Sequence, residues 1–206
     1  MKNKKVINVY EPWLENRDFN FINTIKKNKY VTENIFLDQF EKSIKKYTNS
    51  KHSVGYCNGT MALYAAVCAL KLPKDSEILV SNLTFIASAT SIIAAGMKPV
   101  FCDVRTNSYK LDIKKAKKNL TNKTKAIMVV HLYGYSDDMN DIKKFAKDNN
   151  LKIIEDASQA LGVTFNNIHC GNFGELGVLS FYGNKILTSG EGGMIISKKN
   201  KYNKKI

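Results

Sequence analysis

From about residue 52 onward, short apolar runs alternate with longer segments in which apolar residues recur at helical spacing. The short runs are rich in β-branched residues, which favour extended backbone. They predict strands at Glu77–Ser81, Pro99–Asp103, Ala126–Val130, Lys152–Glu155, Gly177–Phe181 and Met194–Ser197. The intervening segments predict helices at Thr60–Leu70, Ile86–Ala95, Ile113–Leu120 and Ile142–Asn149.

The predicted strands are apolar along their whole length, which is typical of parallel strands covered on both faces. Their alternation with helices predicts an α/β fold with a three-layer, mostly parallel sheet. The last two strands follow each other through glycine-rich loops with no helix between them. We therefore expect one or both of them to run antiparallel.

Residues 1–50 have a helical pattern, with helices predicted at Phe19–Lys26 and Asn34–Thr48. In the second helix the apolar residues share one face: Phe36, Phe40, Ile44 and Tyr47. We divide the chain into an N-terminal helical segment, residues 1–50, and a large α/β domain, residues 51–206. The last ten residues form a polar run without a closing element, so we expect the chain to be a fragment of a longer protein.

The formal net charge of +14 raises the question of nucleic-acid binding. The basic residues are nearly all lysines spread along polar helix faces, and Arg17 and Arg105 are the two arginines of the sequence. Clusters of arginine interleaved with aromatic residues, which mark base or phosphate readout, are missing. We expect a solvated lysine-rich surface that helps to attract an anionic small substrate, and no nucleic-acid partner.

Apolar stretches such as Ile86–Met97 contain serine and threonine, and none reaches the ~20 residues of a membrane span. The basic N-terminus lacks the apolar run of a secretion signal, so we expect a cytoplasmic protein without a membrane partner. The four cysteines (Cys57, Cys68, Cys102 and Cys170) lack the spacing of a zinc site, so we expect no metal site.

Three stretches carry candidate chemistry. Asn58-Gly59-Thr60 opens an alanine-rich helix, where free backbone N–H groups, a small residue and a hydroxyl together would bind a phosphate. An ordinary helix cap by Asn58 or Thr60 is an equally good interpretation of this stretch alone. Asp156 ends a buried strand, where open α/β sheets place ligands, although a capping residue for the next segment is the better interpretation of this stretch alone.

The third stretch contains Lys185, which precedes a glycine-rich turn in an otherwise uncharged segment. Burial lowers the pKa of a lysine and makes its amine nucleophilic, as imine formation requires. A lysine in a surface loop is the alternative. Together the three stretches would supply a phosphate site, a carboxylate for a pyridinium nitrogen, and an amine that forms an imine. The aromatic ring of Phe85 would cover one face of such a cofactor.

These stretches and their neighbours resemble the DegT–StrS family of pyridoxal-phosphate (PLP) nucleotide-sugar aminotransferases, across essentially the whole chain. The matching segments, in order, are NGTMAL, SNLTFIASATSIIAAGMKPVFCDV, KAIMVVHLYGYSDDM, IIEDASQALG and SFYGNKILTSGEGGMI. The resemblance implies the large domain of a fold type I PLP-dependent transferase. The pattern FYGNK followed by LTSGEGGM is closest to GDP-perosamine synthase-like members.

The resemblance also implies roles for individual residues. Lys185 would form the Schiff base with PLP and move protons, and Asp156 would pair with the pyridine nitrogen. Gln159 would lie beside the ring and its hydroxyl, and Phe85 would stack on the ring. The phosphate would be held by Gly59, Thr60 and Ser180.

The implied reaction moves an amino group from L-glutamate to the keto group of a nucleotide-linked 4-keto-6-deoxy sugar, in cell-surface polysaccharide biosynthesis. Members of the family are homodimers with a further, smaller C-terminal domain that this chain lacks. The alternative is a truncated, non-catalytic remnant or partner subunit that binds PLP or a sugar nucleotide. A sugar 3-dehydratase is less compatible, because such relatives replace the Schiff-base lysine, typically with histidine.

Overall fold

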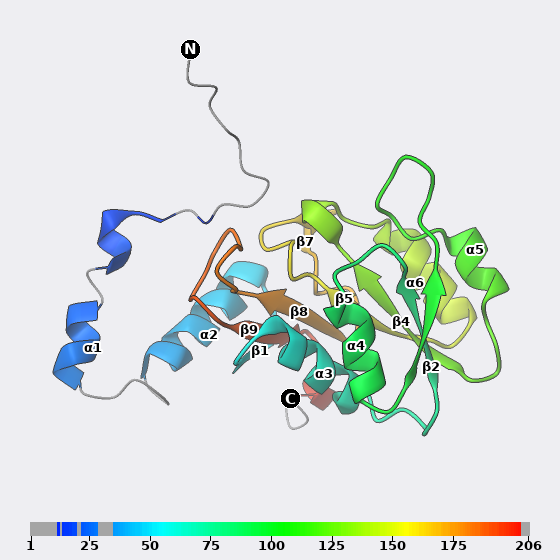
Figure 1. Ribbon diagram of the computed structural model, residues 1–206, viewed down its shortest axis with the longest axis horizontal. Helices are drawn as coiled ribbons and strands as arrows, with labels where there is room; N and C mark the ends of the chain where they lie inside the picture. Colours follow the sequence, from blue (N-terminus) through cyan, green and yellow to red (C-terminus); the bar gives the residue numbers. More distant parts are fainter. Residues whose placement is uncertain (1–11, 13, 20–21, 29–34, 203–206) are drawn as a thin grey trace, which may run out of the picture.

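The computed structural model describes residues 12, 14–19, 22–28 and 35–202 (Figure 1). The helices within these ranges are η1 (Asn16–Phe19), α1 (Ile22–Asn28), α2 (Ile35–Thr48), α3 (Gly59–Ala69), α4 (Ala87–Ala94), α5 (Ile113–Lys118), η2 (Leu132–Gly134), α6 (Met139–Asp148) and η3 (Asn200–Tyr202). The strands are β1 (His52–Tyr56), β2 (Glu77–Ser81), β3 (Lys98–Cys102), β4 (Thr124–Val130), β5 (Lys152–Asp156), β6 (Thr164–Phe165), β7 (Ile168–His169), β8 (Leu176–Ser180) and β9 (Gly193–Ser197).

A central seven-stranded sheet has the order β1-β9-β8-β5-β4-β2-β3. Strands β3, β2, β4, β5 and β8 run parallel to one another. Strand β9 runs antiparallel to both of its neighbours, β8 and β1. The predicted α/β class with a mostly parallel sheet is therefore confirmed. Of the last two strands, β8 is parallel to β5 and only β9 runs antiparallel to its neighbours.

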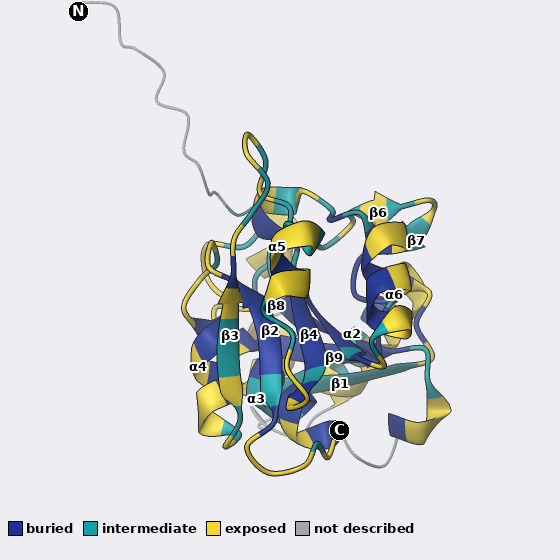
Figure 2. Ribbon diagram, turned by 90° about the vertical axis from the view of Figure 1, so that its right-hand side faces the viewer, coloured by how far each residue is buried: buried dark blue, intermediate teal, exposed yellow. Residues whose placement is uncertain are grey.

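Helices cover both faces of the sheet. Consecutive strand residues point to opposite sides, so the apolar strands have apolar side chains on both faces to bury. On β5, Ile154 belongs to the apolar cluster that packs under α3 and α4, whereas Ile153 belongs to the cluster under α5 and α6. Helix α2 covers the α5/α6 side near β9 through Ile44. Figure 2 shows the central strands mostly buried, while the edge strand β3 is partly exposed.

This alternation of side chains decides which face of the sheet the last residues of β5 and β8 point to. Asp156 lies on the α3/α4 face with Ile154, and Ser180 lies on the same face with Val178. Glu155, between Ile154 and Asp156, points to the opposite face. The carboxyl ends of β5 and β8 therefore present Asp156 and Ser180 to the same side of the sheet.

Strand β1 of the central sheet and the separate hairpin β6–β7 were missing from the sequence-based prediction. Strand β1 has the sequence HSVGY, which is too polar to read as a buried strand. Its pairing with β9 and the packing of α2 on it decide its conformation. The hairpin β6–β7 is short, and its two-residue turn, Asn166–Asn167, has positive φ at both positions, as a type I′ turn requires.

One prediction for α2 is wrong in detail. Ile44 is buried and Phe40 is partly buried against Phe181, with ring centroids 4.7 Å apart. Tyr47 is 64% exposed, although it was expected on the apolar face, and it lies edge-on to His169 instead. The first predicted helix is displaced: Phe19 ends η1, and α1 begins at Ile22, while residues 20–21 lie outside the described ranges.

None of the helices in the described part of the chain combines the length and the apolar character that a membrane span requires. The same residues hold no group of three or more His, Cys, Asp or Glu side chains placed to bind a metal ion. All four cysteines are free thiols; Cys102 and Cys170 are buried.

Candidate active site

A cavity of about 630 Å³ lies where the first turns of α3 and α4 meet the carboxyl ends of β5 and β8. All of the side chains singled out from the sequence line it: Gly59, Thr60, Phe85, Asp156, Gln159, Ser180 and Lys185. The cavity is at the edge of the sheet where open α/β folds bind ligands. The fold thus brings together three stretches that are far apart in the sequence.

One end of the cavity suits an anion. Asn58 caps α3 by accepting a hydrogen bond from the Met61 N–H at 2.9 Å, so the first turn of the helix keeps its remaining N–H groups free. The hydroxyls of Thr60, Ser158 and Ser180 hydrogen-bond to no other residue in the described ranges. Free donors at a helix N-terminus form an anion-binding site, which suits a phosphate.

Gly59 is needed for this arrangement. A Cβ atom at Gly59 would lie 3.1 Å from Ser180 Cβ, 3.3 Å from Ser180 Oγ and 3.6 Å from Ser158 Oγ. Any side chain would therefore fill the space between the helix and the two serines. Gly193 has a related role beneath the helix, because a Cβ there would lie 2.3 Å from the Asn58 carbonyl oxygen.

Asp156 is the last residue of β5 and is only 5% exposed. Its Oδ2 accepts a hydrogen bond from Ser88 Oγ at 2.6 Å, and its Oδ1 accepts one from the Ser158 N–H at 3.2 Å. It forms no ion pair with any residue that the structure describes. A buried carboxylate without a cation is costly, so the side chain is suited to a cationic ligand group.

Lys185 is half-buried in the loop after β8, where its backbone N–H donates to the Tyr182 carbonyl at 2.9 Å. Burial lowers the pKa of its amine below the usual 10.5, and the negative charge of Asp156 acts in the opposite direction. A lowered pKa increases the fraction of uncharged amine at a given pH. The lysine is thus the candidate nucleophile of the cavity.

Phe85 and Gln159 complete the wall. Phe85 precedes α4 and is 66% exposed, so its ring is available to a ligand. The Gln159 side-chain oxygen accepts the Tyr133 N–H at 2.8 Å. Tyr133 adopts the left-handed conformation, with φ 53° and ψ 28°. This bond fixes the direction of the Gln159 amide and leaves its NH₂ group for a ligand.

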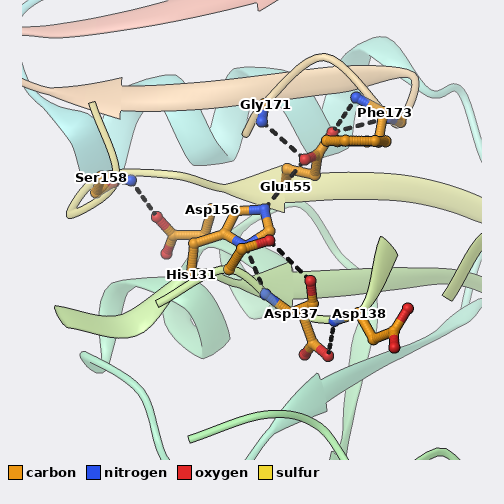
Figure 3. Close-up of polar contacts among 10 residues, drawn as sticks. His131, Asp137, Asp138, Glu155, Asp156, Ser158, Gly171 and Phe173 are labelled. Atoms are coloured by element: carbon orange, nitrogen blue, oxygen red, sulfur yellow. Dashed lines mark hydrogen bonds and ion pairs between the residues drawn. The ribbon is translucent and has the colours of Figure 1, made fainter. Parts of the chain in front are cut away.

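A buried network that the sequence did not reveal lies beside Asp156 (Figure 3). Glu155 is 0% exposed and accepts hydrogen bonds from the N–H groups of Gly171, Phe173 and Gly174, each at 2.7 Å. It also lies 3.1 Å from His131 Nε2. His131 Nδ1 accepts the Asp137 N–H at 3.3 Å, so the ring proton is on Nε2 and is donated to Glu155.

The sequence held a signal for part of this network. Side chains alternate along a strand, so Glu155 and Asp156 point to opposite faces of the sheet. A buried carboxylate without partners is costly, so it was predictable that Glu155 has hydrogen-bond partners. The identity of those partners was not predictable, because His131 and the loop 171–174 are distant in the sequence. The contact of Ser88 with Asp156 was missed for the same reason.

The residues present fit a phosphorylated pyridine aldehyde. The hydroxyls and helix N–H groups suit the phosphate, and the Gly59 cradle has room that a Cβ would fill. Asp156 suits a protonated ring nitrogen, Phe85 offers an exposed aromatic face, and Lys185 offers an amine to the aldehyde. Each of these groups lines the one cavity.

Comparisons with known proteins agree with this geometry. Residues 12–206 match the family model described as the DegT/DnrJ/EryC1/StrS aminotransferase family. The GDP-perosamine synthase of Vibrio cholerae is 34% identical over 193 residues, which cover 93% of this chain and 53% of that protein. The chain therefore spans about half the length of the curated relatives it matches.

Solved structures have the same fold. An aminotransferase from Psychrobacter cryohalolentis superposes with a TM-score of 0.89 at 33% identity, covering 95% of this chain and 51% of that one. An Escherichia coli GDP-4-keto-6-deoxy-D-mannose-3-dehydratase, solved with bound hydrated PLP, has a TM-score of 0.89 at 25% identity. That match covers 95% of this chain and 52% of the other.

Proposed function

Because the chain belongs to the DegT/DnrJ/EryC1/StrS aminotransferase family, we propose that it is the cofactor-binding part of a PLP-dependent sugar aminotransferase. The amino group would pass from L-glutamate to the keto group of a nucleotide-linked 4-keto-6-deoxy sugar, as in GDP-perosamine synthase-like enzymes. The observation that carries the proposal is the convergence of Lys185, Asp156 and the start of α3 on one cavity.

PLP would supply the electron sink and the carrier of the amino group. Lys185 would hold the cofactor at its aldehyde carbon, and its free amine would move a proton as general base and acid. Asp156 would accept a hydrogen bond from the ring nitrogen, which would keep that nitrogen protonated. Its buried carboxylate makes this pairing favourable, because the ligand supplies the missing positive charge.

The remaining site residues orient the cofactor in this proposal. Gly59, Thr60 and Ser180 bind the phosphate, Phe85 stacks on the ring, and the free NH₂ group of Gln159 lies beside the ring hydroxyl. Gln159 is held in place by its bond to Tyr133, so it is oriented before the cofactor binds.

The substrate class is supported by the relatives. The V. cholerae protein is named for a GDP-linked sugar product, and it aligns with nearly all of this chain. The presence of Lys185 in the cavity supports a transaminase over a sugar 3-dehydratase, because dehydratase relatives replace the Schiff-base lysine. The net charge of +14 would assist the approach of an anionic sugar nucleotide.

The proposal extends to the protein in the cell. By likeness to the family, we infer a homodimer in the cytoplasm, with residues 51–206 as the PLP-binding large domain and residues 1–50 as a helical segment before it. A smaller C-terminal domain would complete the active site, as the length of the relatives suggests.

The cofactor assignment is tested by trapping. The purified chain is mixed with PLP, reduced with borohydride and digested, and the peptides are examined by mass spectrometry. We expect the cofactor on Lys185 and none in Lys185→Ala, while Lys143→Ala, which removes an exposed lysine on α6, is labelled like the wild type. Labelling of Lys185→Ala to the wild-type extent would refute the assignment.

The reaction is tested with the protein in its longest natural form. L-Glutamate and a GDP-, UDP- or dTDP-linked 4-keto-6-deoxy sugar are supplied, and the amino sugar nucleotide is identified by mass spectrometry and NMR. Amination of a keto sugar with formation of 2-oxoglutarate supports the proposal. PLP binding without amination of any of these sugars would support the non-catalytic alternative.

A further inference from the structure

The Asp156 carboxylate is held by donors from two different parts of the fold. Ser88 Oγ donates to Oδ2 at 2.6 Å, and the Ser158 N–H donates to Oδ1 at 3.2 Å, the second of which is drawn in Figure 3. Ser88 is 0% exposed and Asp156 is 5% exposed, so water does not compete for the bond between them. With one donor on each oxygen, the rotation of the carboxylate is restricted.

Ser88 also connects Asp156 to Phe85. Its backbone N–H donates to the Phe85 carbonyl at 3.1 Å, in the turn that opens α4. Phe85 is proposed to stack on the cofactor ring, and Asp156 is proposed to meet the nitrogen of the same ring. Ser88 thus joins, through its backbone and its side chain, the two residues that would define the position of the ring.

A second hydroxyl stands behind Ser88. Thr84 Oγ1 lies 2.7 Å from Ser88 Oγ. An ionised carboxylate only accepts hydrogen bonds, so the one hydroxyl proton of Ser88 goes to Asp156, and Ser88 Oγ is left to accept from Thr84. The Thr84 hydroxyl has a second acceptor, the Phe85 carbonyl, at the longer distance of 3.3 Å. With the Thr84 proton on the shorter contact, both O–H dipoles point toward the carboxylate, and such charge-assisted bonds are short and strong.

We propose that Ser88 is a positioning residue, which holds the Asp156 carboxylate in the rotation that meets the pyridine nitrogen of the cofactor. This inference rests on the proposed function, because it assigns Ser88 a role toward PLP. Ser88 acts through Asp156 and does not itself contact the cofactor. Its effect should therefore depend on the presence of a nitrogen in the ring.

The test compares Ser88→Ala with Ser91→Ala in the full chain. Ser91 is on the same helix and equally buried, but its hydroxyl donates to the Ser88 carbonyl at 3.2 Å and does not contact Asp156. The dissociation constant is measured for PLP and for 1-deaza-PLP, in which carbon replaces the ring nitrogen. The circular dichroism band of bound PLP reports how rigidly the ring is held.

We expect Ser88→Ala to weaken PLP binding roughly tenfold, because a hydrogen bond to a charged group is lost. It should also reduce the circular dichroism band and leave the affinity for 1-deaza-PLP nearly unchanged. Ser91→Ala should behave like the wild type with both ligands. A merely structural role for Ser88 would weaken the binding of both ligands equally, and that result would overturn the proposal.

Three further outcomes are decisive. If Ser88→Ala does not fold, Ser88→Cys keeps most of the side-chain volume with a weaker donor, and an affinity for PLP equal to that of Ser91→Ala would overturn the proposal. If the wild-type chain does not bind PLP, the proposed function fails, and this inference fails with it. If the wild type binds PLP on Lys185 and Ser88→Ala binds it equally well, only the role of Ser88 is refuted.

Discussion

Replacing Glu155 with glutamine would test how far the buried network beside the site stabilises the fold. Glu155 Oε1 accepts from the N–H groups of Phe173 and Gly174, and Oε2 accepts from Gly171 and His131. All of these contacts surround a side chain with no exposed surface. The carboxylate thereby holds the loop 171–174 against the end of β4.

The magnitude follows from the number of donors. A glutamine has one acceptor oxygen and one NH₂ group, so in either orientation the NH₂ group faces two donors. His131 Nε2 would accept a hydrogen bond from the new NH₂ group only if the ring proton moved to Nδ1. A proton on Nδ1 would face the Asp137 N–H, so an unpaired donor would remain. Each donor left buried and unpaired costs ~1–3 kcal/mol, so the two together cost about 4 kcal/mol. That is a large share of the ~5–15 kcal/mol by which domains are stable.

The assay is unfolding by urea, followed by far-ultraviolet circular dichroism, for the wild type, Glu155→Gln and Glu191→Gln. Glu191 is exposed and its carboxylate makes no hydrogen bond to a described residue, so its substitution makes the same chemical change without the burial. We expect a loss of about 4 kcal/mol in the free energy of unfolding for Glu155→Gln and almost none for Glu191→Gln. A loss below about 1 kcal/mol for Glu155→Gln would refute the reasoning, because it would mean that the donors find other partners.

Two further predictions concern the cofactor. Gly59→Ala places a Cβ 3.1 Å from Ser180 Cβ, so PLP should bind roughly tenfold more weakly. Pyridoxal, which lacks the phosphate, should bind as it does to the wild type. An equal loss of affinity for both ligands would contradict a phosphate site at Gly59. Burial lowers the pKa of Lys185, so the rate at which the chain binds PLP should rise with pH as the amine loses its proton, with the midpoint of the rise below pH 10.5. A midpoint at or above pH 10.5 in stopped-flow absorbance would contradict this.

Much of the fold was predictable because its signals are local. The strand at Glu77–Ser81 was predicted with its observed bounds, and the helices of the large domain were displaced by at most a few residues. Long apolar runs and helical periodicity indicate burial directly, so they predict helices and strands without knowledge of the tertiary packing. The sequence predicted that one or both of the last two strands run antiparallel, but not that β9 alone does. Strand β1 was not predictable, because a polar strand is stabilised by a partner that is distant in the sequence.

The sequence by itself determined which chemical groups this protein has: a glycine at a helix start, an aspartate at a strand end and one lysine in the loop 181–192. It also determined the family, because those groups occur in a recognisable order. Only the tertiary structure decided that they share one cavity and what holds them there. The partners of Asp156 and Glu155 come from other helices and loops, and a buried carboxylate is bound by whatever donors the chain topology brings within hydrogen-bonding distance.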